Sequence, residues 1–217
     1  MKTILIYGDS NTWGYIPGDS GKRYDHKTRW TMALKKLLNE GCPPEDPAYW
    51  IEEEGQNGRT TCREDPVEGD KNGYRQLPPI LESHKPLDIV IIALGTNDLK
   101  ARFNPTAEDV AKGVLRLVET AQTSKTGPGD SAPKALIICP PPVIGNPDNP
   151  IFKSMFAGGE KISQELPPYF EQAAKECRAT LLKAGDFIKS SSVDGIHFDA
   201  GELTKLARAV ADVIKKL

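Results

Sequence analysis

Two short segments near opposite ends of the chain carry the residue types that serine-based acyl transfer requires. Ser10 follows an apolar run in the segment ILIYGDSNTWG, and Asp194 and His197 stand three residues apart in SVDGIHF. A serine can act as the nucleophile, a histidine as its base, and a carboxylate as the group that orients the histidine. The pattern predicts a catalytic triad of these three residues. A serine in this position could also cap a helix or belong to a loop that binds phosphate.

Two further residues could stabilise negative charge on a reacting carbonyl oxygen. Gly58, in EEGQNGRTT, follows a predicted strand, and a glycine lets its backbone N–H approach a ligand closely. Asn97, in LGTNDLKARF, follows the most apolar strand, and its side-chain amide can donate a hydrogen bond. Taken singly, either residue could serve an ordinary turn. Together with Ser10, Asp194 and His197, they supply a nucleophile, a base, an orienting group and two donors.

The elements that would position these residues alternate between strands and helices. Short apolar or β-branched runs predict strands at 3–7, 49–52, 88–94, 135–139 and 186–188. Apolar residues at helical spacing predict helices at 30–38, 74–83, 106–122, 170–183 and 199–217. Thr106 with Asp109 predicts a capping box at 106, and Asp199 with Glu202 predicts the cap of the last helix. This alternation predicts an α/β fold of three α/β/α layers around a flavodoxin-like, doubly wound parallel sheet. Because ligands bind beyond the carboxyl ends of such strands, we expect the candidate residues to converge on one rim.

Length and composition are those of one globular domain without a nucleic-acid or membrane partner. The 217 residues show no repeat or linker, so we expect a single domain over 1–217 with a proline- and glycine-rich insert at about 140–168. The net charge of −2 provides no basic surface for nucleic acid or an acidic membrane. No apolar run approaches the roughly 20 residues of a membrane span.

The N-terminus and the cysteines bear on the cellular compartment. The segment MKTILIYGDS is too short for a signal peptide and is needed as a strand, so we expect a cytoplasmic protein. The four cysteines include no CxxC pair, which argues against a zinc or redox site and favours free thiols.

The same residues resemble those of the SGNH hydrolases, also called GDSL-type esterases, and the resemblance covers the whole chain. The family is named for four residues, which here would be Ser10, Gly58, Asn97 and His197. Within the family, the chain is similar to small bacterial arylesterases that also work as acyltransferases. The matching pieces are GDSNTWG, the Arg29–Trp30 pair, EEG-x-x-x-RTT, LGTND-x-K, the prolines at 140–142, the GGE at 158–160 and DGIHF.

The resemblance implies a role for each residue. Ser10 attacks the ester carbonyl, His197 takes its proton and later protonates the leaving alcohol, and Asp194 orients His197. The backbone N–H groups of Ser10 and Gly58 and the side-chain amide of Asn97 form the oxyanion hole. The resemblance implies no metal and no organic cofactor.

The leading hypothesis is a serine esterase for small esters with short acyl or aryl groups, working through an acyl-enzyme. It could also transfer the acyl group to an alcohol or to peroxide. The subgroup is oligomeric, so we expect a homo-oligomer in which the insert forms both an interface and part of the pocket. We expect its apolar residues Ile151, Phe152, Met155 and Phe156 to be exposed. The residues expected to bind the ester and alcohol substrates are Trp13, Lys100, Ile151, Phe152, Met155 and Phe156.

Two alternatives remain open at this stage. A carbohydrate acetylesterase uses the same chemistry, but a sugar site favours exposed aromatic residues, and aromatics are only 7% of this chain. A non-catalytic flavodoxin-like module could hold a phosphate in its GDSNT loop. That reading leaves the DGIHF segment unexplained.

Overall fold

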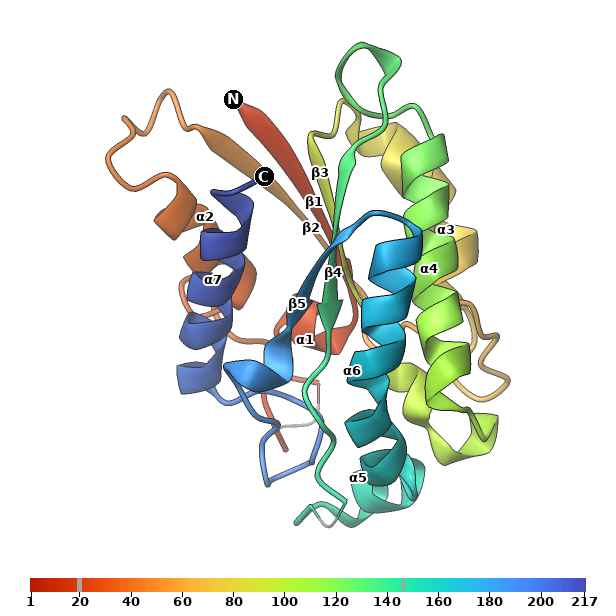
Figure 1. Ribbon diagram of the computed structural model, residues 1–217. Coiled ribbons are helices and arrows are strands. Elements are labelled where there is room, and N and C mark those ends of the chain that lie inside the picture. Colours follow the sequence, from red (N-terminus) through yellow and green to blue (C-terminus); the bar gives the residue numbers. More distant parts are fainter. Residues whose placement is uncertain (19–20, 146) are drawn as a thin grey trace.

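A parallel sheet forms the middle layer of the molecule (Figure 1). The computed structural model describes residues 1–18, 21–145 and 147–217. Within these residues, five strands pair in the order β2-β1-β3-β4-β5, every pair parallel. The strands are β1 (Lys2–Gly8), β2 (Tyr49–Gly55), β3 (Ile89–Ala93), β4 (Lys134–Cys139) and β5 (Thr180–Lys183). The predicted doubly wound, flavodoxin-like sheet is therefore confirmed.

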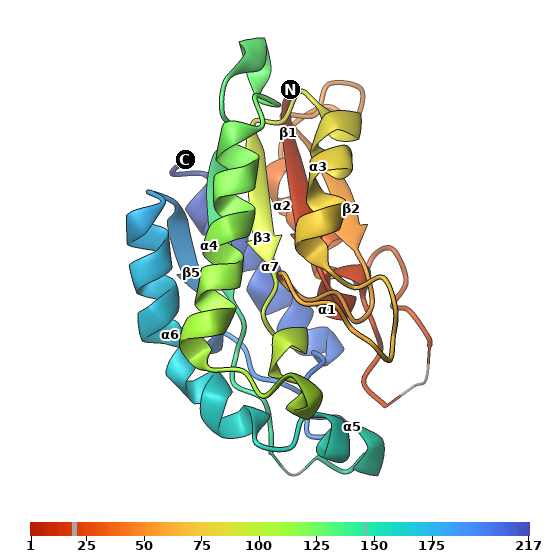
Figure 2. The same cartoon turned by 90° about the vertical axis from the view of Figure 1, so that its right-hand side faces the viewer.

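Helices cover both faces of this sheet, as the two perpendicular views show (Figures 1 and 2). One face carries α2 (Trp30–Leu38) and α7 (Ala200–Ile214). The other carries α3 (Gly73–His84), α4 (Ala107–Thr123) and α6 (Gly159–Glu176). Successive strand residues point to opposite faces, so Ile4 and Ile6 pack with α2 and α7, whereas Leu5 and Tyr7 pack on the other side. Burial on both faces explains why the strand around DIVIIAL shows no polar alternation.

The helix starts bear out one capping prediction and correct another. Thr106 and Asp109 form the predicted capping box at the start of α4. Asp199 occupies the N-cap position of α7, but its side chain makes no cap hydrogen bond. It accepts a hydrogen bond from Ser191 Oγ at 2.9 Å instead, which ties the start of α7 to the loop before it.

The structure differs from the sequence prediction between residues 159 and 188. The predicted helix at 170–183 is the second half of α6, and 180–183 is strand β5. The predicted strand at 186–188 lies in a 3₁₀ turn (Ala184–Asp186) and the residues after it. Two prolines, Pro167 and Pro168, predict a helix break, yet α6 continues through them because one face of it is buried in the core. Arg178, with a φ of 53°, ends this segment without the glycine that usually announces such a turn.

The predicted insert is partly helical. Residues 150–155 form the short helix α5 (Pro150–Met155), and α6 begins at Gly159; residue 146 lies outside the described part of the chain. Cys42, Cys62, Cys139 and Cys177 are free thiols, as expected. None of the helices in the described residues is long and apolar enough to cross a membrane.

Candidate active site

Ser10 stands where the backbone leaves β1 and enters the four-residue helix α1 (Ser10–Trp13). Asp9 caps this helix by accepting a hydrogen bond from the Asn11 N–H at 2.9 Å. The strand approaches the helix so closely that a Cβ on Gly8 would lie 2.0 Å from Thr12 Oγ1, so only glycine fits there. This sharp turn leaves Ser10 at the carboxyl end of the sheet, beside the point where the strand order reverses between β1 and β3.

The predicted triad residues are joined by an unbroken chain of hydrogen bonds. Ser10 Oγ and His197 Nε2 are 2.8 Å apart, and His197 Nδ1 and Asp194 Oδ2 are also 2.8 Å apart. All three residues are at most 5% exposed, so water competes little for these contacts. Burial opposes ionisation of Asp194, but the hydrogen bond and charge of His197 outweigh it, so the pKa of Asp194 is below its usual value.

The loop that carries the histidine is fixed by the same carboxylate. Asp194 Oδ1 accepts hydrogen bonds from the backbone N–H groups of Ile196 at 3.2 Å and of His197 at 3.0 Å. The Gly18 N–H donates to Asp194 Oδ2 at 3.1 Å, which adds the loop after α1. Asn11 Nδ2 donates to the Ile196 carbonyl at 3.1 Å, so the serine and histidine loops are bound directly to each other.

Two aromatic rings enclose the imidazole of His197. The ring of Tyr15 stacks on it, with centroids 4.2 Å apart and planes inclined by 17°. The ring of Phe152 meets it edge-on, with centroids 5.6 Å apart and planes at 85°. These contacts hold the imidazole in one orientation. Sequence reasoning missed Tyr15, because its place depends on the turn at Gly14 (φ 95°) that follows α1.

The three predicted oxyanion donors lie on three loops around Ser10. Gly58 has a φ of 82°, a left-handed conformation that favours glycine. Asn97 is 4% exposed, and its Nδ2 is a buried donor that has no hydrogen-bond partner among the described residues. The backbone N–H groups of Ser10 and Gly58 make no hydrogen bond within the described part of the chain either. Buried donors are nearly always paired, so unpaired donors beside a nucleophile are open for a substrate oxygen.

Arg59 fixes the Gly58 loop to the serine loop. Its Nη1 donates to the Gly8 carbonyl at 2.8 Å and also to the Glu54 carbonyl. The guanidinium lies over the ring of Tyr7, with Cζ 4.1 Å from the centroid. One arginine thus joins the ends of β1 and β2. It stands in the EEG-x-x-x-RTT segment, whose pattern does not reveal this contact.

Comparison with known proteins identifies the family to which this arrangement belongs. A sequence profile of the GDSL-like lipase/acylhydrolase family matches residues 6–200. The chain belongs to this family. No curated protein sequence matches it.

Three solved structures resemble this GDSL-like acylhydrolase over essentially its whole length. A carbohydrate acetylesterase from Sinorhizobium meliloti is 39% identical, with a TM-score of 0.91 over 100% of this chain and 99% of that one. The M. smegmatis aryl esterase is 38% identical, with a TM-score of 0.91 over 100% of both chains. A putative arylesterase from Agrobacterium tumefaciens is 35% identical, with a TM-score of 0.85 over 100% of this chain and 99% of that one. The protein is a carboxylic ester hydrolase with the fold of these esterases.

A cavity of about 180 Å³ opens in front of Ser10 and the donors of this acylhydrolase. Its wall combines apolar side chains with polar or charged ones. The apolar and aromatic lining residues include Tyr15, Phe152, Met155, Phe156 and Ile196, and the polar or charged ones include Asn57, Glu68 and Lys100. Sequence reasoning did not predict Asn57, which directly precedes Gly58, or Glu68, which stands in no recognisable motif.

The six residues expected to bind substrate divide into two groups. Lys100, Phe152, Met155 and Phe156 line the cavity, whereas, among the described residues, Trp13 and Ile151 do not. The Trp13 ring packs against the ring of Tyr15, a lining residue, with their centroids 6.3 Å apart. Ile151 points outward and is 67% exposed, whereas Phe156, expected to be exposed, is only 4% exposed because it packs into the core.

Lys100 is a buried cation within the cavity wall. Its Nζ lies 3.1 Å from Asp65 Oδ2 and 2.6 Å from Glu68 Oε1, and Arg102 pairs with the same two carboxylates. Two positive and two negative groups thus balance one another beside the donors. In the described part of the chain, no group of three or more His, Cys, Asp or Glu residues is placed to hold a metal ion.

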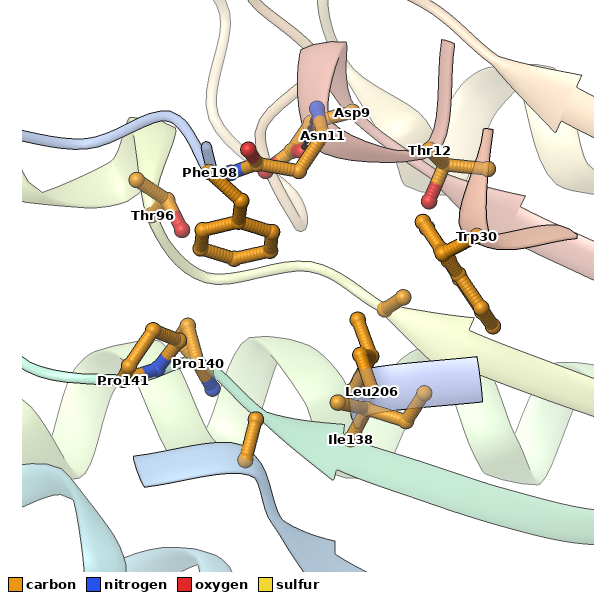
Figure 3. Close-up of a pocket in the computed structure, with 12 residues that line it drawn as sticks. Asp9, Asn11, Thr12, Trp30, Thr96, Ile138, Pro140, Pro141, Phe198 and Leu206 are labelled. Atoms are coloured by element: carbon orange, nitrogen blue, oxygen red, sulfur yellow. Dashed lines mark hydrogen bonds between the residues drawn. The ribbon is translucent and has the colours of Figure 1, made fainter. Parts of the chain in front are cut away.

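A second cavity, of about 30 Å³, lies behind the serine loop on the α2 and α7 side of the sheet (Figure 3). Its surroundings are mainly apolar, with Trp30, Phe198 and Leu206 among them and Asp9 at its edge. Burial raises the pKa of Asp9 to about 6. Ser10 is not among the described residues that line this space, so the candidate active site is the cavity of about 180 Å³.

Proposed function

We propose that this esterase hydrolyses small esters through an acyl-enzyme on Ser10. Ser10 Oγ attacks the ester carbonyl carbon while its proton passes to His197 Nε2, and Asp194 stabilises the imidazolium that forms. The carbonyl oxygen becomes negative and accepts hydrogen bonds from the N–H of Ser10, the N–H of Gly58 and Asn97 Nδ2. The bond to the alcohol oxygen then breaks, and His197 returns the proton to the departing alcohol. The observation that carries the proposal is the Ser10–His197–Asp194 hydrogen-bond chain beside an unpaired amide donor.

The second half of the reaction decides between hydrolysis and acyl transfer. Water attacking the acyl carbon, with His197 as its base, gives a carboxylic acid and frees Ser10. An alcohol in the same place gives a new ester, and hydrogen peroxide gives a peracid. The apolar lining residues Phe152, Met155 and Phe156 support binding of an alcohol in preference to water. We therefore propose acyltransferase and perhydrolase activities beside hydrolysis.

The cavity supports esters with short acyl chains or aryl alcohols. A space of about 180 Å³ is smaller than most ligand pockets, which suits an acetyl group and one ring. Aryl alcohols can pack against the aromatic and methionine side chains that line the cavity. We propose that Lys100 closes the cavity beside Glu68 through its ion pairs, rather than by binding the ester directly.

A carbohydrate acetylesterase is the second candidate, and one observation favours it. Asn57 lines the cavity, and its Oδ1 is a buried acceptor without a partner in the described residues. A sugar hydroxyl could donate to it. A comparison of an acetylated sugar with an aryl acetate at equal concentration separates the two candidates, because each predicts a higher kcat/KM for its own substrate.

We further propose that the chain forms a homo-oligomer through the α5 region. Ile151 projects outward there with 67% of its surface exposed, beside Pro150 and Arg102. Sedimentation velocity of the wild type and of Ile151→Asp tests this, and a wild-type monomer would contradict it.

The first test of the proposed function is turnover of p-nitrophenyl acetate and p-nitrophenyl octanoate by the wild type and by Ser10→Ala. We expect acetate to be the better substrate and the variant to lose activity, with benzyl alcohol diverting acetyl groups into benzyl acetate. An active Ser10→Ala variant would contradict the mechanism. An inactive wild type that phosphate protects from thermal unfolding would favour the phosphate-binding module instead.

A further inference from the structure

One buried carboxylate joins two of the loops that carry the oxyanion donors. Asp98, which is 0% exposed, follows Asn97 directly in the sequence. Its Oδ1 accepts a hydrogen bond from Thr61 Oγ1 at 2.6 Å, and its Oδ2 accepts one from the Thr61 N–H at 2.9 Å. Thr61 is three residues beyond Gly58. The contact therefore connects the loop after β3 with the loop after β2.

The sheet itself does not make this connection. β1 lies between β2 and β3 and pairs with both, so no ladder hydrogen bonds join β2 to β3. Arg59 ties the Gly58 loop to the end of β1 but does not reach Asn97. The Asp98–Thr61 pair joins the two loops beside Asn97 and three residues from Gly58. Lys100 and Arg102 join the same loops further along the chain, through Asp65 and Glu68.

Thr61 is held firmly in place by the residues packed around it. It is 1% exposed, and α4 packs against it so closely that a Cβ on Gly113 would lie 2.1 Å from Thr61 Oγ1. Close packing by α4 leaves the Thr61 hydroxyl little room to move from its hydrogen bond to Asp98. A hydrogen bond to a carboxylate is also stronger and shorter than one between neutral groups.

Apart from Thr61, little in the surroundings of Asp98 stabilises its charged carboxylate. The nearest cation, Arg63, has its Nε 3.8 Å away. Burial raises the pKa of Asp98 to about 6, so the surroundings disfavour its charged form. An apolar or amide side chain would be easier to bury, which indicates that the charge serves something other than stability.

We propose that Asp98 is a positioning residue for the oxyanion hole, setting the separation between the Gly58 N–H and the Asn97 amide by holding Thr61. This proposal rests on the proposed function, since it assumes that the Gly58 N–H and the Asn97 amide act in the transition state. Asp98 does not touch the substrate. Its removal leaves the triad intact and misplaces donors, so the loss falls on kcat rather than on KM.

The test is a double-mutant cycle measured with p-nitrophenyl acetate at pH 8. The variants are Asp98→Asn, Asn97→Ala and the pair together, with Thr61→Val as a second way to break the clamp if the Asp98 variant does not fold. Asp88→Asn is the matched control, because the Asp88 carboxylate accepts the Thr3 N–H at 2.8 Å at the opposite end of the sheet. Thermal unfolding of every variant checks the fold.

We expect Asp98→Asn to lower kcat about 10- to 100-fold with KM changed less than about threefold, as a misplaced catalytic group does. In the Asn97→Ala background the same substitution should cost at least threefold less, because one of the two donors it aligns is gone. Thr61→Val should follow the same pattern with a smaller loss, and Asp88→Asn should leave kcat within about twofold.

Two results would overturn the inference. One is a cost of Asp98→Asn that is within threefold of equal in the two backgrounds, which would mean that it acts independently of Asn97. The other is a kcat loss for Asp98→Asn no larger than that of Asp88→Asn. If Asn97→Ala and Ser10→Ala both keep wild-type activity, the proposed function fails instead. If those two variants lose activity while Asp98→Asn does not, this inference alone fails.

Discussion

Replacing Asn97 by alanine separates a catalytic role from a structural one. In the free enzyme Asn97 Nδ2 is buried and has no partner among the described residues. An unsatisfied buried donor costs about 1–3 kcal/mol of stability, so its removal should not destabilise the protein. In the transition state the same donor should face the oxyanion, where one such hydrogen bond contributes about 2.7–4 kcal/mol. The expected result is a loss of about 10²- to 10³-fold in kcat with an unchanged or higher melting temperature.

The assay combines p-nitrophenyl acetate kinetics with thermal unfolding of the same samples. A gain of 1 kcal/mol corresponds to roughly 2–4 °C in a chain of this size, so an increase of a few degrees is measurable. KM should change little, because the donor acts on the transition state more than on the ester. A large fall in melting temperature together with a small fall in kcat would refute the reasoning, because Asn97 would then be a structural residue.

Three other substitutions test further parts of the site. Asp194→Asn should lower kcat by up to about 10⁴-fold, because the imidazole of His197 loses the acceptor that fixes its tautomer; a loss below tenfold would contradict this. Gly58→Ala should lower both kcat and the melting temperature, because alanine would have to adopt a φ of 82° and its Cβ would lie 2.4 Å from Glu68 Oε2; unchanged stability would contradict it. Asp9→Asn should stabilise the protein at pH 8 by up to about 3 kcal/mol, because a pKa raised from 3.8 to about 6 makes ionisation unfavourable in the folded state. The unfolded carboxyl ionises from about pH 4 and the folded one from about pH 6, so this gain should grow between those values and vanish below pH 4 in urea unfolding; a gain independent of pH would contradict it.

The sequence predicts most of the sheet because its signals are local. β1, β3 and β4 are short apolar runs buried on both faces, and strand–helix alternation determines their parallel pairing. The region after residue 159 was predicted less well. There, tertiary burial carries α6 through Pro167 and Pro168, and Arg178 supplies a left-handed turn that residue type does not announce.

The site divides in the same way. Ser10, Asn97 and His197 stand in motifs that can be recognised along the chain, and the structure brings them together at the sheet edge. Tyr15 and Arg59 act through contacts between distant segments, so spacing along the chain does not reveal these contacts, even though Arg59 stands in the EEG-x-x-x-RTT segment. Exposure of the insert's apolar side chains also depends on tertiary packing, which leaves Ile151 exposed and buries Phe156.

The most direct test of the central claim is to trap the acyl group on Ser10. The wild type and Ser10→Ala would be mixed with p-nitrophenyl acetate, quenched in acid within the first turnover, and measured by intact-protein and peptide mass spectrometry. We expect one acetyl group on the wild type, in the peptide that contains Ser10, with a matching burst of p-nitrophenol and neither in the variant. Acetate production by the wild type without any acetylated Ser10 peptide, or with acetylation at another residue, would contradict the mechanism.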